Sequence, residues 1–230
     1  MIRKIIFTTA FGLFFVFGKA QENFKKIFSS DYEKASQFLN KEKWIQDSIR
    51  SYGMHPKEAI AIIFPELIRY SSVQDKIETF ALESLYIQYG KDYSNFSINQ
   101  FQIKPSFAEA IEIDFLKTFK GEKKKIFQFS VSDTIQNQNN RANRLERIKS
   151  KSGMVDYLCL FILIMDKKYP HWKNREEKIK FFASAYNCGY QRPKSEIESY
   201  QSKKFFYTGI PILSTKYCYA DIALYFFKQP

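Results

Sequence analysis

Apolar side chains recur every three or four residues along most of this chain, and this spacing constrains the fold more than any other feature. Such spacing is typical of amphipathic helices. It predicts helices over residues 24–52, 55–70, 73–89, 105–119, 141–169, 174–188 and 219–228. Apolar and polar side chains alternate instead over residues 92–104, as in short extended structure. The expected fold is therefore mainly α, with a small irregular or β patch near residues 92–104.

Several residues predict where these helices are interrupted and which of their side chains face the core. Pro65 lacks the amide proton that a continuing helix needs, so its helix should kink or restart there. Gly153 should interrupt a later helix, and the polar segment 127–140 should form an exposed loop. The apolar spacing also places Phe80 and Leu85 on the buried face of their helix.

The first twenty residues predict an export signal. Arg3 and Lys4 form a basic start, an apolar stretch follows, and small residues end the segment at Ala20. The apolar stretch is shorter than the roughly 20 residues of a membrane helix, although an uncleaved anchor stays open as an alternative. We expect an exported protein, periplasmic, outer-envelope or secreted, with no integral membrane span after cleavage. Its mature part, residues 21–230, should form a single domain.

The chain is strongly basic, with a formal charge of +12. Loss of the signal, which carries Arg3, Lys4 and Lys19 and no acidic residue, leaves +9. A basic exported protein is attracted to anionic polymers, among them cell-wall glycans and nucleic acid. The aromatic residues lie at helical core spacing, which favours packing over nucleic-acid stacking, so we do not expect a nucleic-acid partner.

The three cysteines match no metal-ligand spacing, so we expect no metal and no cofactor. Cys159 lies in an apolar run and is expected to be buried. If a disulfide forms, Cys188 with Cys218 is the preferred pair. The only histidines, His55 and His171, stand beside no plausible nucleophile, which argues against a Ser-His-Asp or Cys-His mechanism.

Glu66 is the first candidate for catalysis. It follows the apolar run "AIAIIFP", and a carboxyl group among apolar neighbours has a raised pKa, which allows it to carry a proton near neutral pH. A general acid requires such a group. The alternative interpretation is a glutamate near a helix end whose carboxylate simply reaches water.

Two further motifs resemble those of a known family. In "NQFQIKP", Gln102 and Pro105 match the Gln-x-x-Pro of a Gly-Leu-Met-Gln-x-x-Pro motif, and Asn99 stands at the position of its glycine. Residues 185–189, "AYNCG", match an Ala-Tyr-Asn-Ala-Gly motif. The chain thereby resembles the soluble lytic transglycosylases and goose-type lysozymes of the lysozyme-like superfamily over residues 55–190. Its C-terminal segment is loosely similar to exported relatives in Bacteroidetes-type bacteria.

This resemblance implies a lysozyme-like fold and a peptidoglycan-cleaving glycosidase. One glutamate would donate a proton to the β-1,4 bond between N-acetylmuramic acid and N-acetylglucosamine, as in a lytic transglycosylase or a lysozyme-like muramidase. The peptidoglycan glycan strand would be the partner. The resemblance also implies which side chains contact the sugars, namely Ser97, Gln100, Gln102, Tyr186 and Asn187. It places the Tyr186 hydroxyl beside the catalytic acid.

Departures from the family pattern leave alternatives open. The family has Glu-Ser about eighteen residues before the motif glutamine, whereas Glu66 precedes Leu67. Glu83 precedes Ser84 and lies nineteen residues before Gln102, so it is the alternative acid, and Glu78 is a third choice.

The class of activity also stays open. Asp92 could serve as a second carboxylate, which bears on hydrolase against transglycosylase chemistry. The absence of the motif glycine and of a Glu-Ser pair at Glu66 leaves a second hypothesis, namely an inactive lysozyme-fold protein that binds peptidoglycan or assists envelope assembly.

Overall fold

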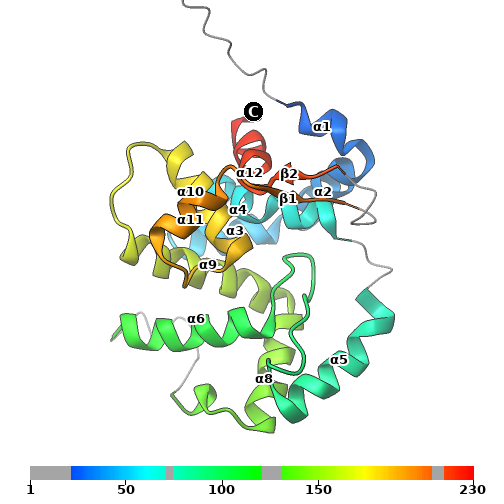
Figure 1. Ribbon diagram of the computed structural model, residues 1–230, viewed down its shortest axis with the longest axis vertical. Coiled ribbons are helices and arrows are strands. Elements are labelled where there is room, and N and C mark those ends of the chain that lie inside the picture. Colours follow the sequence, from blue (N-terminus) through cyan, green and yellow to red (C-terminus); the bar gives the residue numbers. More distant parts are fainter. Residues whose placement is uncertain (1–21, 71–74, 121–130, 209–214) are drawn as a thin grey trace, which may run out of the picture.

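The computed structural model describes residues 22–70, 75–120, 131–208 and 215–230 (Figure 1). The predicted export signal, residues 1–20, lies outside this part of the chain. The described chain is mainly helical, which confirms the predicted fold class. Its elements are α1 Phe24–Ile27, α2 Ser29–Lys41, α3 Trp44–Ser51, α4 Pro56–Arg69, α5 Asp75–Tyr89, α6 Pro105–Thr118, the 3-10 turn η1 Val131–Thr134, α8 Gln138–Lys149, α9 Lys151–Lys168, α10 Arg175–Cys188, α11 Lys194–Tyr200, β1 Lys204–Phe206, β2 Tyr217–Cys218 and α12 Tyr219–Lys228.

The helices form two groups joined by α9. In the first group α4 is central and packs against α2, α3, α10 and α12. In the second group α8 packs against both α5 and α6 (Figure 1). The apolar helix α9 contacts α6 and α8 on one side and α3 and α4 on the other, so it carries the core from one group to the other. Among the helices described, none has the length and apolar character that a membrane crossing requires.

Helix α4 continues through Pro65, so the predicted break there is wrong. The helix extends to Arg69, and the Tyr70 N–H still donates to the Glu66 carbonyl oxygen at 2.9 Å. Proline removes one amide donor, but α4 is buried against α10 and α12 along this stretch, and tertiary packing holds the helical path. The consequence is that Glu66 lies within the last turn of a buried helix.

Helix boundaries differ from the prediction in two more places. Residues 24–52 form three helices, α1 to α3, instead of one. The interruption expected at Gly153 occurs at Ser150, whose hydroxyl oxygen accepts the Gly153 N–H at 3.0 Å. Gly153 is needed for a different reason: a Cβ atom there would overlap the carbonyl oxygen of Arg147, where α8 and α9 meet.

The predicted loop and the predicted patch have mixed outcomes. Helix α8 begins at Gln138, inside the predicted loop 127–140, and the Asn137 side chain caps it; residues 127–130 lie outside the described ranges. Residues 92–104 are irregular with a single bridge between Ile98 and Ile103, as expected. The two-stranded antiparallel sheet of β1 and β2 and the short helix α11 were not predicted.

Buried polar groups fasten the second group of helices. The Arg144 guanidinium is fully buried and donates to the Glu112 carboxylate at 2.8 and 2.9 Å. It also donates to the Tyr86 hydroxyl, which in turn donates to Glu109 at 2.8 Å. Tyr157 adds a hydrogen bond to Glu112 at 2.5 Å. This network places Tyr86, not the periodic apolar residues, on the inner face of α5, and the predicted burial of Phe80 and Leu85 is wrong.

Candidate active site

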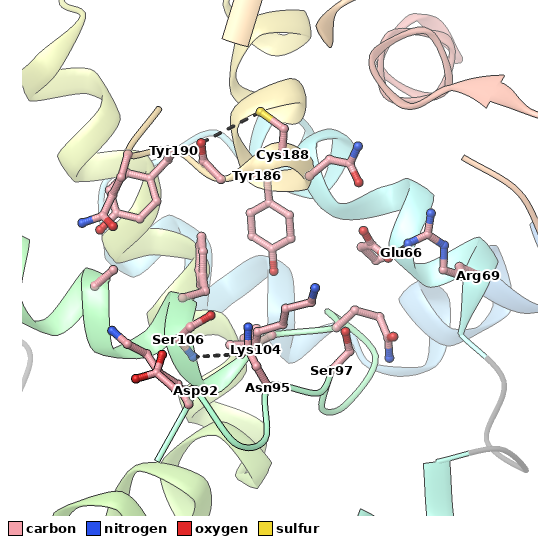
Figure 2. Close-up of a pocket in the computed structure, with 18 residues that line it drawn as sticks. Glu66, Arg69, Asp92, Asn95, Ser97, Lys104, Ser106, Tyr186, Cys188 and Tyr190 are labelled. Atoms are coloured by element: carbon pink, nitrogen blue, oxygen red, sulfur yellow. Dashed lines mark hydrogen bonds and ion pairs between the residues drawn. The ribbon is translucent and has the colours of Figure 1, made fainter. Parts of the chain in front are cut away.

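A pocket of about 520 Å³ lies between the two groups of helices. The end of α4, the irregular segment 92–104, the start of α6 and the end of α10 form its walls (Figure 2). It brings together candidate side chains that lie far apart in the sequence, namely Glu66, Ser97, Gln102, Tyr186 and Asn187.

Glu66 is only 5% exposed and opens onto the pocket from the last turn of α4. Burial raises the pKa of its carboxyl group above the usual range. The positive charge of Arg69, the nearby Tyr219 hydroxyl and the charge of Lys104 each lower the pKa, but the desolvation of the carboxylate prevails. The group therefore retains a proton to higher pH than an exposed glutamate does.

Tyr186 projects into the middle of the pocket, beside Glu66 and with its hydroxyl toward the segment 92–104 (Figure 2). Its hydroxyl donates to the Phe101 carbonyl oxygen at 2.8 Å, and its ring packs edge-on against Phe107 and Phe161. Burial, together with the charge of Glu66, raises the pKa of the phenol well above its ordinary value. Tyr186 is thus a neutral donor that ties α10 to the pocket floor.

The pocket floor is built on two left-handed residues. Asn99 has φ +59° and Gln102 has φ +53°. Asn99, which replaces the motif glycine, is held there because its Oδ1 accepts the Phe101 N–H at 2.8 Å and its Nδ2 donates to the Ile148 carbonyl oxygen at 2.6 Å. Gln102 donates from Nε2 to the Asn99 carbonyl oxygen at 2.8 Å. The local hydrogen bonds therefore hold a non-glycine residue in this left-handed conformation and keep Gln102 at the pocket.

The other candidate residues are placed differently. Glu83 lies on α5 with its carboxylate 3.3 Å from Lys149 Nζ, and neither it nor Gln100 lines the pocket. The side chain of Glu78 lies outside the described part of α5. Asp92 does line the pocket, but it is exposed and lies on the opposite side from Glu66 (Figure 2).

Two residues in contact with Glu66 were missed by sequence reasoning. Arg69 Nη1 lies 3.5 Å from Glu66 Oε2, and this i, i+3 spacing on a helix was a usable signal. The Tyr219 hydroxyl donates to the Ile62 carbonyl oxygen at 3.2 Å and lies close enough to the Glu66 carboxyl group to affect its pKa. No local pattern linked Tyr219, at the start of α12, to a glutamate more than 150 residues away.

The cysteines are free, so the preferred Cys188–Cys218 disulfide does not form. Cys218 Sγ lies 3.0 Å from the Gln201 carbonyl oxygen, whereas Cys188 Sγ faces the carbonyl oxygen of Gly189. Within the described ranges, no group of three or more histidine, cysteine, aspartate or glutamate side chains is arranged to hold a metal ion.

Comparison of the chain with protein-family models, with curated proteins and with solved structures gives no match. The resemblance to lysozyme-like enzymes therefore depends on the quoted motifs alone.

Proposed function

We propose that this protein cleaves peptidoglycan glycan strands at the β-1,4 bond between N-acetylmuramic acid and N-acetylglucosamine, with Glu66 as general acid and base. The observation that carries this proposal is a buried carboxyl group with a raised pKa that opens onto a pocket large enough for sugar rings. Glutamates with raised pKa values in apolar surroundings serve as proton donors in glycoside cleavage.

In the proposed reaction, protonated Glu66 donates its proton to the glycosidic oxygen. The bond between that oxygen and the anomeric carbon breaks, and the leaving sugar departs with a free hydroxyl group. Glu66, now a carboxylate, accepts a proton from the attacking hydroxyl as the new bond to the anomeric carbon forms, which restores the protonated acid. The nearby positive charge of Arg69 favours the intermediate carboxylate.

The remaining side chains would bind and orient the strand. Ser97, Gln102 and Asn187 supply hydroxyl and amide groups at the pocket wall, and such groups pair with sugar hydroxyls and acetamido groups. Tyr186 would position the acid and the pocket floor together, since it lies next to both. Gln100 does not line the pocket and receives no role.

The attacking hydroxyl defines the product. A single-carboxylate mechanism with the muramyl 6-hydroxyl as nucleophile leaves a 1,6-anhydro end, whereas attack by water leaves a reducing end. Asp92 lines the pocket on the side opposite Glu66, where the base of an inverting hydrolase would stand, so the product end also decides whether Asp92 takes part. We further propose that the export signal delivers the protein to the cell envelope, where the basic chain meets this anionic polymer.

The test uses the mature chain, residues 21–230, on purified sacculi. We expect lysis by the wild type and by Glu83→Gln, and loss of lysis in Glu66→Gln. Mass spectrometry of the released muropeptides assigns the anhydro or the reducing end.

Two outcomes would contradict the proposal. Lysis retained in Glu66→Gln but lost in Glu83→Gln would move the acid to α5. Binding to sacculi without lysis by the wild type would favour the inactive binding protein.

A further inference from the structure

We infer that Arg69 is a positioning residue that controls the charge state of Glu66, and that Phe206 and Tyr207, at the end of β1, hold Arg69 in place. The significance of this pairing for catalysis rests on the proposed function, whereas its effect on the Glu66 carboxyl group does not.

The contact between the two groups is loose and asymmetric. Arg69 Nη1 lies 3.5 Å from Glu66 Oε2, at the limit of a hydrogen bond and longer than a typical charge-assisted one. The carboxylate side chain is 7% exposed and the arginine side chain 35% exposed. A cation in this position attracts the carboxylate without fixing it as one half of a tight bidentate pair. Glu66 therefore stays able to take up and release a proton.

Aromatic rings from the C-terminal segment support the guanidinium. Its central carbon lies 4.5 Å from the ring centroid of Phe206, the last residue of β1, and 5.8 Å from that of Tyr207. Arg69 Nε is buried and has no hydrogen-bond partner among the described residues. The ring faces, more than hydrogen bonds, thus hold the group beside Glu66.

Phe206 is itself fixed by the core. It is fully buried and packs edge-on against Phe28 and Tyr219. The Phe206 ring thus contacts both Arg69 of α4 and Tyr219 of α12, two residues that lie beside Glu66. The C-terminal segment, which lies outside the motif-bearing core of residues 55–190, therefore completes the surroundings of Glu66.

Arg69 is the strongest charged influence on Glu66. The other titratable groups that face the carboxyl group are Lys104 from the segment before α6, Tyr186 from α10 and Tyr219 from α12. Both phenols stay neutral because burial raises their pKa values well above the ordinary range. Lys104 is exposed, so water screens its charge. Removal of the Arg69 cation should therefore raise the pKa of Glu66 further.

The experiment measures the carboxyl titration directly, by carbon NMR of protein labelled at glutamate side chains, with Glu66→Gln to assign the signal. Arg69→Met removes the cation and keeps a long side chain, Arg69→Lys keeps a charge that stacks less well, and Phe206→Leu loosens the support. The matched control is Arg50→Met, which removes an exposed i, i+3 partner of Asp47 on α3.

We expect the Glu66 midpoint to rise by about one pH unit in Arg69→Met, as for loss of a neighbouring opposite charge. The rise should be smaller in Arg69→Lys and Phe206→Leu, and absent in Arg50→Met. The alkaline limb of the pH profile of sacculus lysis should move in the same direction.

An unchanged Glu66 midpoint in Arg69→Met would overturn the inference. If Arg69→Met does not fold, an unchanged midpoint in both Arg69→Lys and Phe206→Leu would overturn it instead. Absence of lysis by the wild type, with the midpoint still shifted in the variants, would overturn the proposed function and leave this electrostatic pairing intact.

Discussion

The Tyr186 hydroxyl donates to the Phe101 carbonyl oxygen across 85 positions of sequence, at 2.8 Å. This single bond joins the end of α10 to the left-handed segment that forms the pocket floor. Both partners are buried. The segments 99–105 and 185–189 are therefore held together by a hydrogen bond as well as by packing.

Tyr186→Phe should lower the free energy of unfolding by about 1–2 kcal/mol, because it leaves the buried Phe101 carbonyl oxygen unpaired. Urea denaturation measures this loss. Tyr225→Phe, which removes a 2.8 Å hydrogen bond to Asn23 away from the pocket, is the control. Sacculus lysis should fall only in Tyr186→Phe. Equal lysis by the two variants would separate this hydroxyl from the site.

Substitutions at Asn99 should depend on the backbone angle. Asn99→Val should destabilise the protein by about 1–3 kcal/mol, because a β-branched residue is strained at φ +59° and the two side-chain hydrogen bonds are lost. Asn99→Gly loses the same hydrogen bonds but relieves the strain, so it should be the more stable of the two. Denaturant titration of the pair decides, and a valine variant as stable as the glycine variant would contradict the left-handed geometry.

Loss of the buried Arg144 should be severe. Arg144→Met leaves Glu112 and Glu109 with less compensation in a dry interior, which costs about 3–5 kcal/mol for a buried pair that loses one partner. Lys34→Met, which removes an exposed pair with Asp31, should change the free energy of unfolding by less than about 1 kcal/mol. Thermal and urea unfolding of both variants provide the comparison. Similar losses in the two would show that the buried network does little for stability.

The raised pKa of Glu66 predicts a specific pH dependence of stability. The folded state holds this proton more tightly than the unfolded state does, so Glu66 costs stability as the pH rises from the unfolded pKa through the folded one. Glu66→Gln removes that cost. Relative to the wild type, the variant should gain stability between acidic and neutral pH, and the gain should level off above the folded pKa. Urea unfolding at a series of pH values tests this, and a difference that stays constant with pH would be contrary to it.

The fold class followed from the sequence because the helical period of apolar residues extends along nearly the whole chain. The errors arose where tertiary contacts prevailed over local rules. Pro65 ends no helix because its surroundings in α4 are packed on several sides. Helix α5 turns Tyr86 inward because that hydroxyl has buried partners in Glu109 and Arg144, which no apolar period reveals.

In the candidate site too, local patterns pointed to some residues, whereas residues placed by long-range contacts were missed. Short motifs predicted Gln102, Tyr186 and Asn187, and the apolar run before Glu66 predicted its raised pKa. Tyr219 reaches the acid only because α12 packs on α4, a long-range contact with no local signature. A single sequence shows which chemical group such a residue carries, but not which distant residues it contacts in the fold.

The close packing at Gly153 also bears on the floor of the pocket. Helix α8 turns into α9 where only a hydrogen atom fits against the Arg147 carbonyl oxygen, and the neighbouring Ile148 carbonyl oxygen is the one that anchors Asn99. A methyl group at residue 153 would therefore force the backbone to shift at this corner, next to the carbonyl oxygen on which Asn99 depends. The position of Asn99, and with it the floor of the pocket, thus depends on a glycine that is not itself among the lining residues.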